Sequence, residues 1–368
     1  MNISNDDALW AANEFINYFK NLQTIEDYLR YVKKEVLDQM SAVSSFSDDI
    51  FNADIHPEEM NFVMLPVGKD GFDQRYYRSL LAAVSSHNNE QNIPGREHKW
   101  IVKETTTNTV VGFIRIGSPT INSKPRNNWI GKSPDLRLFN QHACMGFVIV
   151  PTQPFGYNYL GGKLLSLLCC SHFTREFISK KFEKDICLFE TTSLYGSTTS
   201  CSQYDGLKPF MRFRGLTESK FTPLLHDDQF HKLHDRFTYL NGGNPLTDNK
   251  ASSKKMKRQT KMISIIKKCL QDQEKLDEFN DVMSKAFSLT EKKRFYTSEY
   301  GYENVREVLA GEQTQLRRGQ NWEKFELENI IKWWKKKASK RYEKLKAEGR
   351  FRDRIELWTE TDDIQIIR

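Results

Sequence analysis

The hydrophobic positions change their spacing along the chain, from helical near the N-terminus to strand-like further on. Apolar side chains recur every three or four residues over 8–42, which predicts two helices. "MNFVMLPV" (60–67) predicts a strand, and "DQRYYRSLLAAVSS" (73–86) predicts a helix. In 98–119 two β-branched and aromatic runs flank a Thr-Asn pair, and this pattern predicts a β-hairpin.

The stretch "MGFVIVPTQPFGYNYLGGKLLSLLCCSHF" predicts a strand over 143–151, a turn over 152–159 and a helix over 160–181. Another strand is expected over 185–196, and 202–216 predicts a short helix that leads into a loop. Strands and helices alternate here, so we expect an α/β fold with a mixed central sheet flanked by helices.

The flanking segments differ from this α/β pattern. We expect a helical N-terminal segment over 1–57, the α/β domain over 58–240 and a linker over 241–256, where Gly, Pro, Asn and Ser gather. The spacing predicts helices beyond the linker, so 257–368 is expected to form a basic helical module.

Charge and apolar run lengths narrow the class of protein. The 368 residues contain no apolar run of about 18 residues, and the N-terminus lacks the basic-then-apolar order of a secretory signal. We therefore expect a cytoplasmic protein without a membrane partner, in the host cytoplasm if it is viral. The six cysteines show no Cys-x-x-Cys spacing and are expected to be free thiols.

The excess positive charge is concentrated near the C-terminus. Residues 331–350 hold nine Lys or Arg and two Glu, and this excess equals the +7 of the whole chain. Lysines attract phosphates, and neighbouring Trp and Tyr side chains stack on bases, so we expect a nucleic acid partner, DNA before RNA. Alternatively, the tryptophans pack on the core while the lysines lie in water, or the helix rests on a membrane surface. The candidate nucleic-acid-binding residues are Lys332, Lys335, Lys336, Lys337, Lys340 and Arg341.

The glycine-bearing turn at 152–163 has the composition of an anion site. Such a turn between a strand and a helix exposes backbone N–H groups at the positive end of the helix dipole. Alternatively, the glycines serve only turning and close packing. The candidate cofactor-binding residues are Gln153, Gly156, Asn158, Gly161, Gly162 and Lys163.

The order of elements resembles the core of the GNAT acyltransferase superfamily. In that superfamily the fourth strand runs into a phosphate-cradling turn of the type Gln/Arg-x-x-Gly-x-Gly/Ala. The turn here reads Gln-Pro-Phe-Gly-Tyr-Asn, with Asn158 where Gly or Ala is usual. The resemblance implies acyl-CoA or another acyl donor at the turn. It also implies that Tyr204 acts as a catalytic acid; otherwise Tyr204 is a packing residue.

A second resemblance covers about 110–220. "VVGFIRIGSP", "NNWIGKSPDLRLFN", "FVIVP", "YLGGKLL" and "LFETTSLYGSTTSCSQYDGLKPFMRFRGLTES" occur in the order found in the DruA-type domain of Druantia phage-defence systems. That domain is a GNAT-like relative, as are phage Mom-type DNA-modification proteins. The resemblance implies a transferase-like fold with DNA as substrate. It also implies that the polar segment after the hairpin contacts substrate, where a surface loop is the alternative. The candidate residues are Trp129, Lys132, Ser133 and Arg137.

Glu190 is the candidate catalytic base. It follows an apolar run that ends in Phe189, and desolvation there raises the pKa of a carboxyl, as a base requires. A structural, ion-paired Glu is the alternative. "HDDQFHKLHD" (226–235) contains His and Asp at helical spacing, but no metal site is expected because no second cluster accompanies it.

Two hypotheses follow. One is a GNAT-like transferase that modifies base amino groups of nucleic acid in a phage or phage-defence setting, with protein or a small amine as other acceptors. The other is a non-catalytic nucleic-acid-binding or assembly protein that retains the fold. They differ in whether the turn faces an open cleft or is filled by Phe155 or Tyr157.

Overall fold

The chain folds into two compact units, each built from segments far apart in the sequence. One unit consists of Met1–Val32 with Glu218–Glu291, and the other of Lys33–Thr217 with Lys292–Arg368. The computed structural model describes residues 1–38, 47–68, 73–85, 95–193, 201–220, 222–248 and 254–359. The unit that contains Met1–Val32 is the helical unit, and the unit that contains Lys33–Thr217 is the sheet unit.

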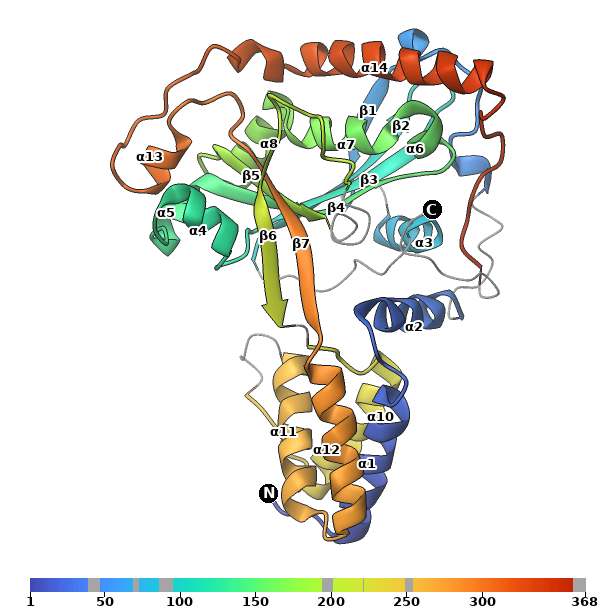
Figure 1. Cartoon of the computed structure of the whole chain (residues 1–368), viewed down its shortest axis with the longest axis vertical. Coiled ribbons are helices and arrows are strands. Elements are labelled where there is room, and N and C mark those ends of the chain that lie inside the picture. Colours follow the sequence, from blue (N-terminus) through green and yellow to red (C-terminus); the bar gives the residue numbers. More distant parts are fainter. Residues whose placement is uncertain are drawn as a thin grey trace. The chain divides into compact units, whose positions relative to one another are not determined.

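The helical unit packs its amphipathic helices around a common core. Ala8, Ala11 and Phe15 pack with Met262 and Phe279 of other helices, because each helix repeats its apolar residues every three or four positions. These helices are α1 (Asn5–Phe19), α10 (Asp227–Leu240), α11 (Lys254–Cys269) and α12 (Gln273–Phe287), with the start of α2 (Ile25–Asp38). Figure 1 shows α1, α10, α11 and α12 side by side.

Within the described residues, seven strands form one sheet in the order β1-β2-β3-β4-β5-β7-β6. The pairs β1–β2, β2–β3, β3–β4 and β5–β7 are antiparallel, and β4–β5 is parallel. The strands are β1 (Phe62–Pro66), β2 (Glu97–Glu104), β3 (Thr109–Gly117), β4 (Ala143–Pro151), β5 (Leu188–Ser193), β6 (Arg212–Lys220) and β7 (Thr290–Ser298).

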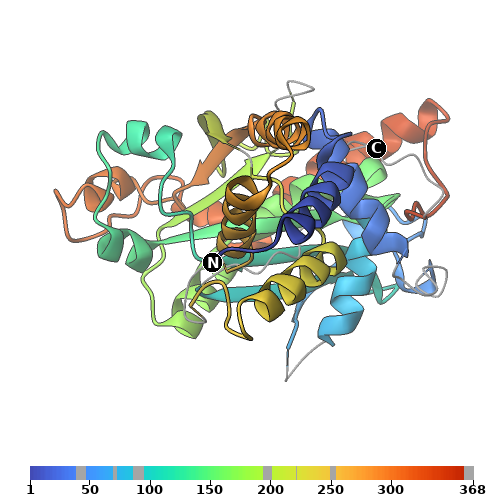
Figure 2. The ribbon, with the colours of Figure 1, turned by 90° about the horizontal axis from the view of Figure 1, so that it is seen from below.

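Helices cover both faces of this sheet (Figures 1 and 2). Ile101 and Phe113 pack under α3 (Gln74–Val84), whereas Trp100 and Ile114 face the opposite side, because successive strand residues alternate between faces. That opposite face carries α6 (Phe155–Tyr159), α7 (Gly161–Cys169), α8 (His172–Phe182) and α14 (Leu327–Ala347). Shorter helices are α4 (Lys124–Ile130), α5 (Leu136–His142), α13 (Val305–Leu309), η2 (Pro57–Glu59) and η3 (Trp322–Phe325).

The structure confirms the mixed α/β class and the strongest local patterns. The hairpin closes at Asn108, which adopts the left-handed φ of 55° that Asn tolerates. The strand over 143–151 has the predicted bounds. Residues 194–200, which include the end of the other predicted strand, lie outside the described part of the chain.

Three expectations need correction. The helix over 160–181 is two helices, because the Ser171 hydroxyl accepts the Thr174 N–H and caps a new start. The segment 202–216 forms turns followed by strand β6 instead of a helix. The predicted helical stretch beyond 257 contains β7, which pairs with β5 in the sheet and buries Phe295 and Tyr296.

The compact units do not follow the consecutive segments expected from the sequence. The N-terminal helices join residues 218–291 in one unit, and the C-terminal residues from 292 onward belong to the sheet unit. The predicted linker 241–256 connects α10 and α11 within the helical unit; its residues 249–253 lie outside the described part.

Trp334 ties α14 to the sheet unit. Its ring is fully buried near Phe62 and Phe155, and its Nε1–H donates to the Tyr159 carbonyl at 3.1 Å. We expect Trp334→Ala to lower the free energy of unfolding by about 3 to 5 kcal/mol, because it opens a cavity and removes a buried hydrogen bond. Denaturant unfolding measures this, with the half-buried Trp333→Ala as control. Equal costs for the two variants would contradict the assigned packing of α14.

Candidate functional site

The backbone N–H groups of the turn after β4 are largely occupied by the chain itself. The Gly156 N–H donates to the Thr152 carbonyl at 2.8 Å, and the Asn158 N–H donates to the Pro154 carbonyl at 3.0 Å. The Tyr157 N–H donates to the Gln153 side-chain oxygen at 3.0 Å. These amides would have to exchange their present partners to bind a phosphate.

The glycines of the turn lie against neighbouring side chains. A Cβ at Gly161 would come within 2.5 Å of the Phe155 ring, and a Cβ at Gly162 would collide with the side chain of Gln203. A Cβ at Gly156 would lie 2.6 Å from the Gln153 side-chain nitrogen. Because Phe155 is fully buried in this packing, the glycines permit close approach within the chain.

Lys163 is also engaged within the chain. Its ammonium donates to the Gln203 carbonyl at 3.3 Å and to the Asp205 carbonyl. Burial lowers the pKa of Lys163, and the negative charge of Asp205 opposes that shift. Its charge therefore points toward the 203–205 loop.

The segment that follows α14 is bound to the turn. The Asn158 amide donates to the Arg352 carbonyl at 2.7 Å, and the Arg352 N–H donates to the Asn158 side-chain oxygen at 3.0 Å. The Arg352 guanidinium lies 3.7 Å from the centre of the Tyr157 ring, and that of Arg341 lies 4.6 Å from it. Arg350 donates to the Tyr157 hydroxyl at 3.0 Å. The turn and the C-terminal basic residues therefore form one connected structure.

The parallel pair β4–β5 separates partway along its length. Their register runs from Ala143 opposite Leu188 to Gly146 opposite Thr191, while β4 continues to Pro151 beside β3. The Gln203 amide donates to the Ile149 carbonyl of β4 at 2.9 Å beyond this point. Tyr204, which follows Gln203 in the chain, is buried, and its ring lies edge-on to that of Tyr296 with the ring centres 5.2 Å apart.

Glu190 lies in the sheet just before this separation, in a buried ion pair with Arg126 of α4. Neither side chain is exposed to solvent (0% for both), and Arg126 Nη1 lies 3.2 Å from Glu190 Oε2. Desolvation raises the pKa of Glu190 to about 7, and the charge and hydrogen bond of Arg126 oppose that rise. The carboxyl therefore gains and loses its proton near neutral pH.

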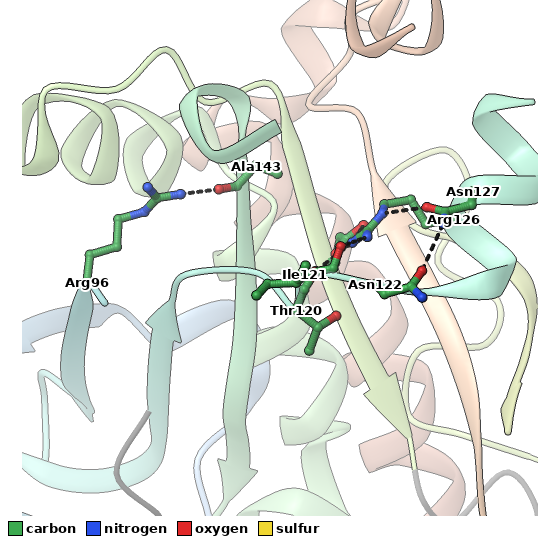
Figure 3. A network of polar contacts seen from close by, with 8 residues as sticks. Arg96, Thr120, Ile121, Asn122, Arg126, Asn127 and Ala143 are labelled. Atoms are coloured by element: carbon green, nitrogen blue, oxygen red, sulfur yellow. Dashed lines mark hydrogen bonds and ion pairs between the residues drawn. The ribbon is translucent and has the colours of Figure 1, made fainter. Parts of the chain in front are cut away.

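Arg126 is held by groups from the loop before α4, and its role was not predicted from the sequence. Its guanidinium donates to the Thr120 carbonyl at 2.9 Å and the Ile121 carbonyl at 2.8 Å, and it lies 4.0 Å from the Phe139 ring centre. Figure 3 shows the hydrogen-bonded groups beside the strands. The sequence signal for it was a single arginine three residues before Trp129, the first of the four predicted substrate contacts (Trp129, Lys132, Ser133 and Arg137).

The four predicted substrate contacts are spread over the neighbouring surface. The Arg214 guanidinium lies 4.2 Å from the centre of the Trp129 ring, pairs with Glu299 and donates to the Thr297 hydroxyl at 2.8 Å. Thr297 is the register partner of Glu190, so this group lies next to the buried pair. The side chains of the other predicted substrate contacts are exposed: Lys132, Ser133 and Arg137.

The basic residues of α14 fall into two sets. Lys335 donates to the Glu58 carbonyl at 2.7 Å and Arg341 to the Tyr157 carbonyl at 3.3 Å, so both bind within the unit. The remaining four candidates are exposed, and Lys337 lies over the Trp333 ring at 5.6 Å. Among the described residues, none forms an ion pair or hydrogen bond with the ammonium groups of the other three: Lys332, Lys336 and Lys340.

The described residues provide neither a metal cluster nor a membrane span. In the ranges that the structure covers, no cluster of three His, Cys, Asp or Glu side chains is placed to hold a metal ion. None of the helices described is both long and apolar enough to span a bilayer.

The Arg126–Glu190 pair makes a pH-dependent prediction. The folded-state pKa of Glu190 lies above its ordinary 4.5, so this carboxyl's contribution to stability falls as pH rises from 4.5 through about 7. We expect Arg126→Met to cost about 3 to 5 kcal/mol of unfolding free energy at pH 8, where the carboxylate loses its partner. At pH 5.5 the cost should be smaller, because the carboxyl is protonated. Denaturant unfolding at both pH values measures it.

Glu190→Gln provides the control, since it cannot ionise. In that background Arg126→Met should cost the same at both pH values. A wild-type background that shows no pH difference would contradict the pairing.

Comparison with known proteins places the chain in a family. No curated protein and no solved structure matches it. The family model described as Druantia protein DruA matches residues 14–204, which is more than half of the chain and includes β1 to β5 and the Arg126–Glu190 pair. The chain therefore belongs to the DruA family of the Druantia phage-defence system.

Proposed function

We propose that this DruA-family protein binds nucleic acid during phage defence through the exposed lysines of α14. The observation that carries the proposal is the unpaired set Lys332, Lys336 and Lys340, spaced four residues apart on one side of the helix. Phosphates that bind such a row release condensed counterions, which favours association without base recognition. Glu343 lies three residues after Lys340, and its carboxylate lies 3.9 Å from His56 Nε2.

We propose that the scaffold is GNAT-like, but that side chains and backbone groups of the chain itself occupy the space at its turn. Support for the scaffold comes from the β4–turn–helix–β5 order and from the separation of β4 and β5. The turn amides, Lys163 and Asn158 already bind groups of the chain, and Phe155 occupies the packing space beside the glycines. These contacts favour the binding hypothesis over acyl transfer.

Neutralising the free lysines tests the α14 interface. We expect Lys332→Gln, Lys336→Gln and Lys340→Gln together to reduce the slope of log K against log salt for duplex DNA. The reduction should be about 0.9 for each phosphate that the variant no longer neutralises. Fluorescence anisotropy over a salt series measures this.

The matched control neutralises Lys335, Lys344 and Lys346 of the same helix, whose ammonium groups bind Glu58, Glu348 and Asp54. The control should change the slope less. An equal change in both triple variants would argue against the assigned row.

Acyl-type transfer to a base amino group is the second candidate, favoured by one observation. Glu190 has a pKa of about 7 at the point where β4 and β5 part, and a general base works best near the operating pH. In this scheme acyl-CoA or another acyl donor would bind at the turn, and Tyr204 would supply the acid. The 350–358 segment and Gln203 would first have to leave the turn.

Mass spectrometry of nucleosides from DNA propagated with and without the protein tests this candidate. Transfer predicts a new modified nucleoside that disappears with Glu190→Gln and persists with the exposed control Glu183→Gln. The Glu190→Gln variant should still bind DNA. An unchanged nucleoside profile would remove the transfer hypothesis and leave the binding proposal intact.

A further inference from the structure

The helical unit contains a second basic surface that the α14 proposal does not use. Helix α11 reads "KKMKRQTKMISIIKKC", with seven Lys or Arg and no acidic residue. Two neighbouring helices of the unit are acidic on balance: α1 carries only Asp and Glu among its charges, and α12 has four acids and two lysines. The positive charge of the unit is therefore concentrated on one helix.

Four of the α11 lysines share one face. Lys254, Lys257, Lys261 and Lys268 follow the three- and four-residue spacing of a helix, which places them within about a sixth of its circumference. They are all exposed. At a rise of 1.5 Å per residue the row is about 21 Å long, enough to follow several phosphates of a nucleic acid strand.

Several other cations of the unit are ion-paired, whereas the row has no such partner among the described residues. Four cations on α10 and α12 each form an ion pair with a carboxylate: Lys232, Arg236, Lys275 and Lys285. On α11, Lys255 pairs with Asp227. In the portion of the chain that the structure covers, no group forms an ion pair or hydrogen bond with the four lysines of the row.

The placement of the row works against the stability of the helix. Lys254 and Lys257 lie in the first turn, where the positive end of the helix dipole disfavours cations, and no acidic residue of α11 offsets them there. Lys257 and Lys261 are four residues apart, and like charges at that spacing repel each other. A bound polyanion removes this repulsion.

The buried side of α11 argues against a membrane surface as the polyanion. Met262, Ile265 and Ile266 are buried in the core of the helical unit. A helix that lies on a membrane surface needs an apolar face free to enter the lipid, and α11 has already buried its own. The row itself is polar and basic, which suits a phosphate backbone.

We propose that the face of α11 formed by Lys254, Lys257, Lys261 and Lys268 is a second nucleic-acid-binding surface, separate from α14. It contacts the phosphate backbone of a duplex without reading its bases. The inference rests on the proposed nucleic-acid-binding function and adds a contact in the other compact unit.

The test neutralises the row in the full-length protein. Lys→Gln at these four positions should reduce the slope of log K against log salt for duplex DNA by about 3 to 4, since each neutralised phosphate contributes about 0.9 to it. The thermal unfolding temperature should stay unchanged or rise, because like-charge repulsion is relieved. A structural role for the lysines would instead lower the unfolding temperature.

The matched control removes the same charge from the same unit by neutralising Lys232, Arg236, Lys275 and Lys285, which are ion-paired. It should change the slope much less than the α11 variant does. Equal changes of the slope in the two variants would overturn the inference, because DNA affinity would then depend only on the net charge of the protein. An unchanged DNA affinity with weaker binding to phosphatidylserine–phosphatidylcholine vesicles would also overturn it.

Combining the α11 variant with the α14 triple variant separates this inference from the proposed function. Additive reductions of the slope support both surfaces. A reduction in the α11 variant alone supports the inference and removes the α14 interface. A reduction in the α14 variant alone supports the proposed function and overturns the inference.

Discussion

The parallel pairing of β4 with β5 is the constraint on which the sheet unit depends. Parallel neighbours need a crossover connection, and α6, α7 and α8 supply it on one face of the sheet. The crossover places the glycine-bearing turn beside β4 and gives α14 a surface to pack on. The same pairing carries Glu190 into the interior, where a carboxyl requires a partner, and Arg126 provides it.

The turn illustrates how one local sequence serves packing or ligand binding according to what lies next to it. Gly161 and Gly162 would leave room for a ligand if their surroundings were open, but Phe155 and Gln203 occupy that space. Asn158, where GNAT-type turns usually have Gly or Ala, binds the backbone at Arg352 through its amide. The residue that departs from the motif is therefore the one that holds the C-terminal segment on the turn.

Basic residues in this chain have two physical roles that composition alone does not separate. Arg341 and Arg352 surround Tyr157 and help to hold the C-terminal segment on the turn. Among the described residues, the rows on α14 and α11 lie in water without acidic partners, which is the condition under which lysines bind phosphates by releasing counterions. A similar net charge can thus stabilise a fold or attract a polyanion, and the difference depends on which acids and rings lie nearby.

Local spacing by itself determined the hairpin at Asn108 and the strand that ends at Pro151, because these patterns involve neighbouring residues. The mixed α/β class and the motifs of the DruA family were also readable from the chain. Only the tertiary structure decided that β7 inserts between β5 and β6, since its alternating pattern is short and set among helices. It also decided that Arg126 meets Glu190 from 64 residues away and that the turn is filled, because such contacts depend on the packing of distant segments.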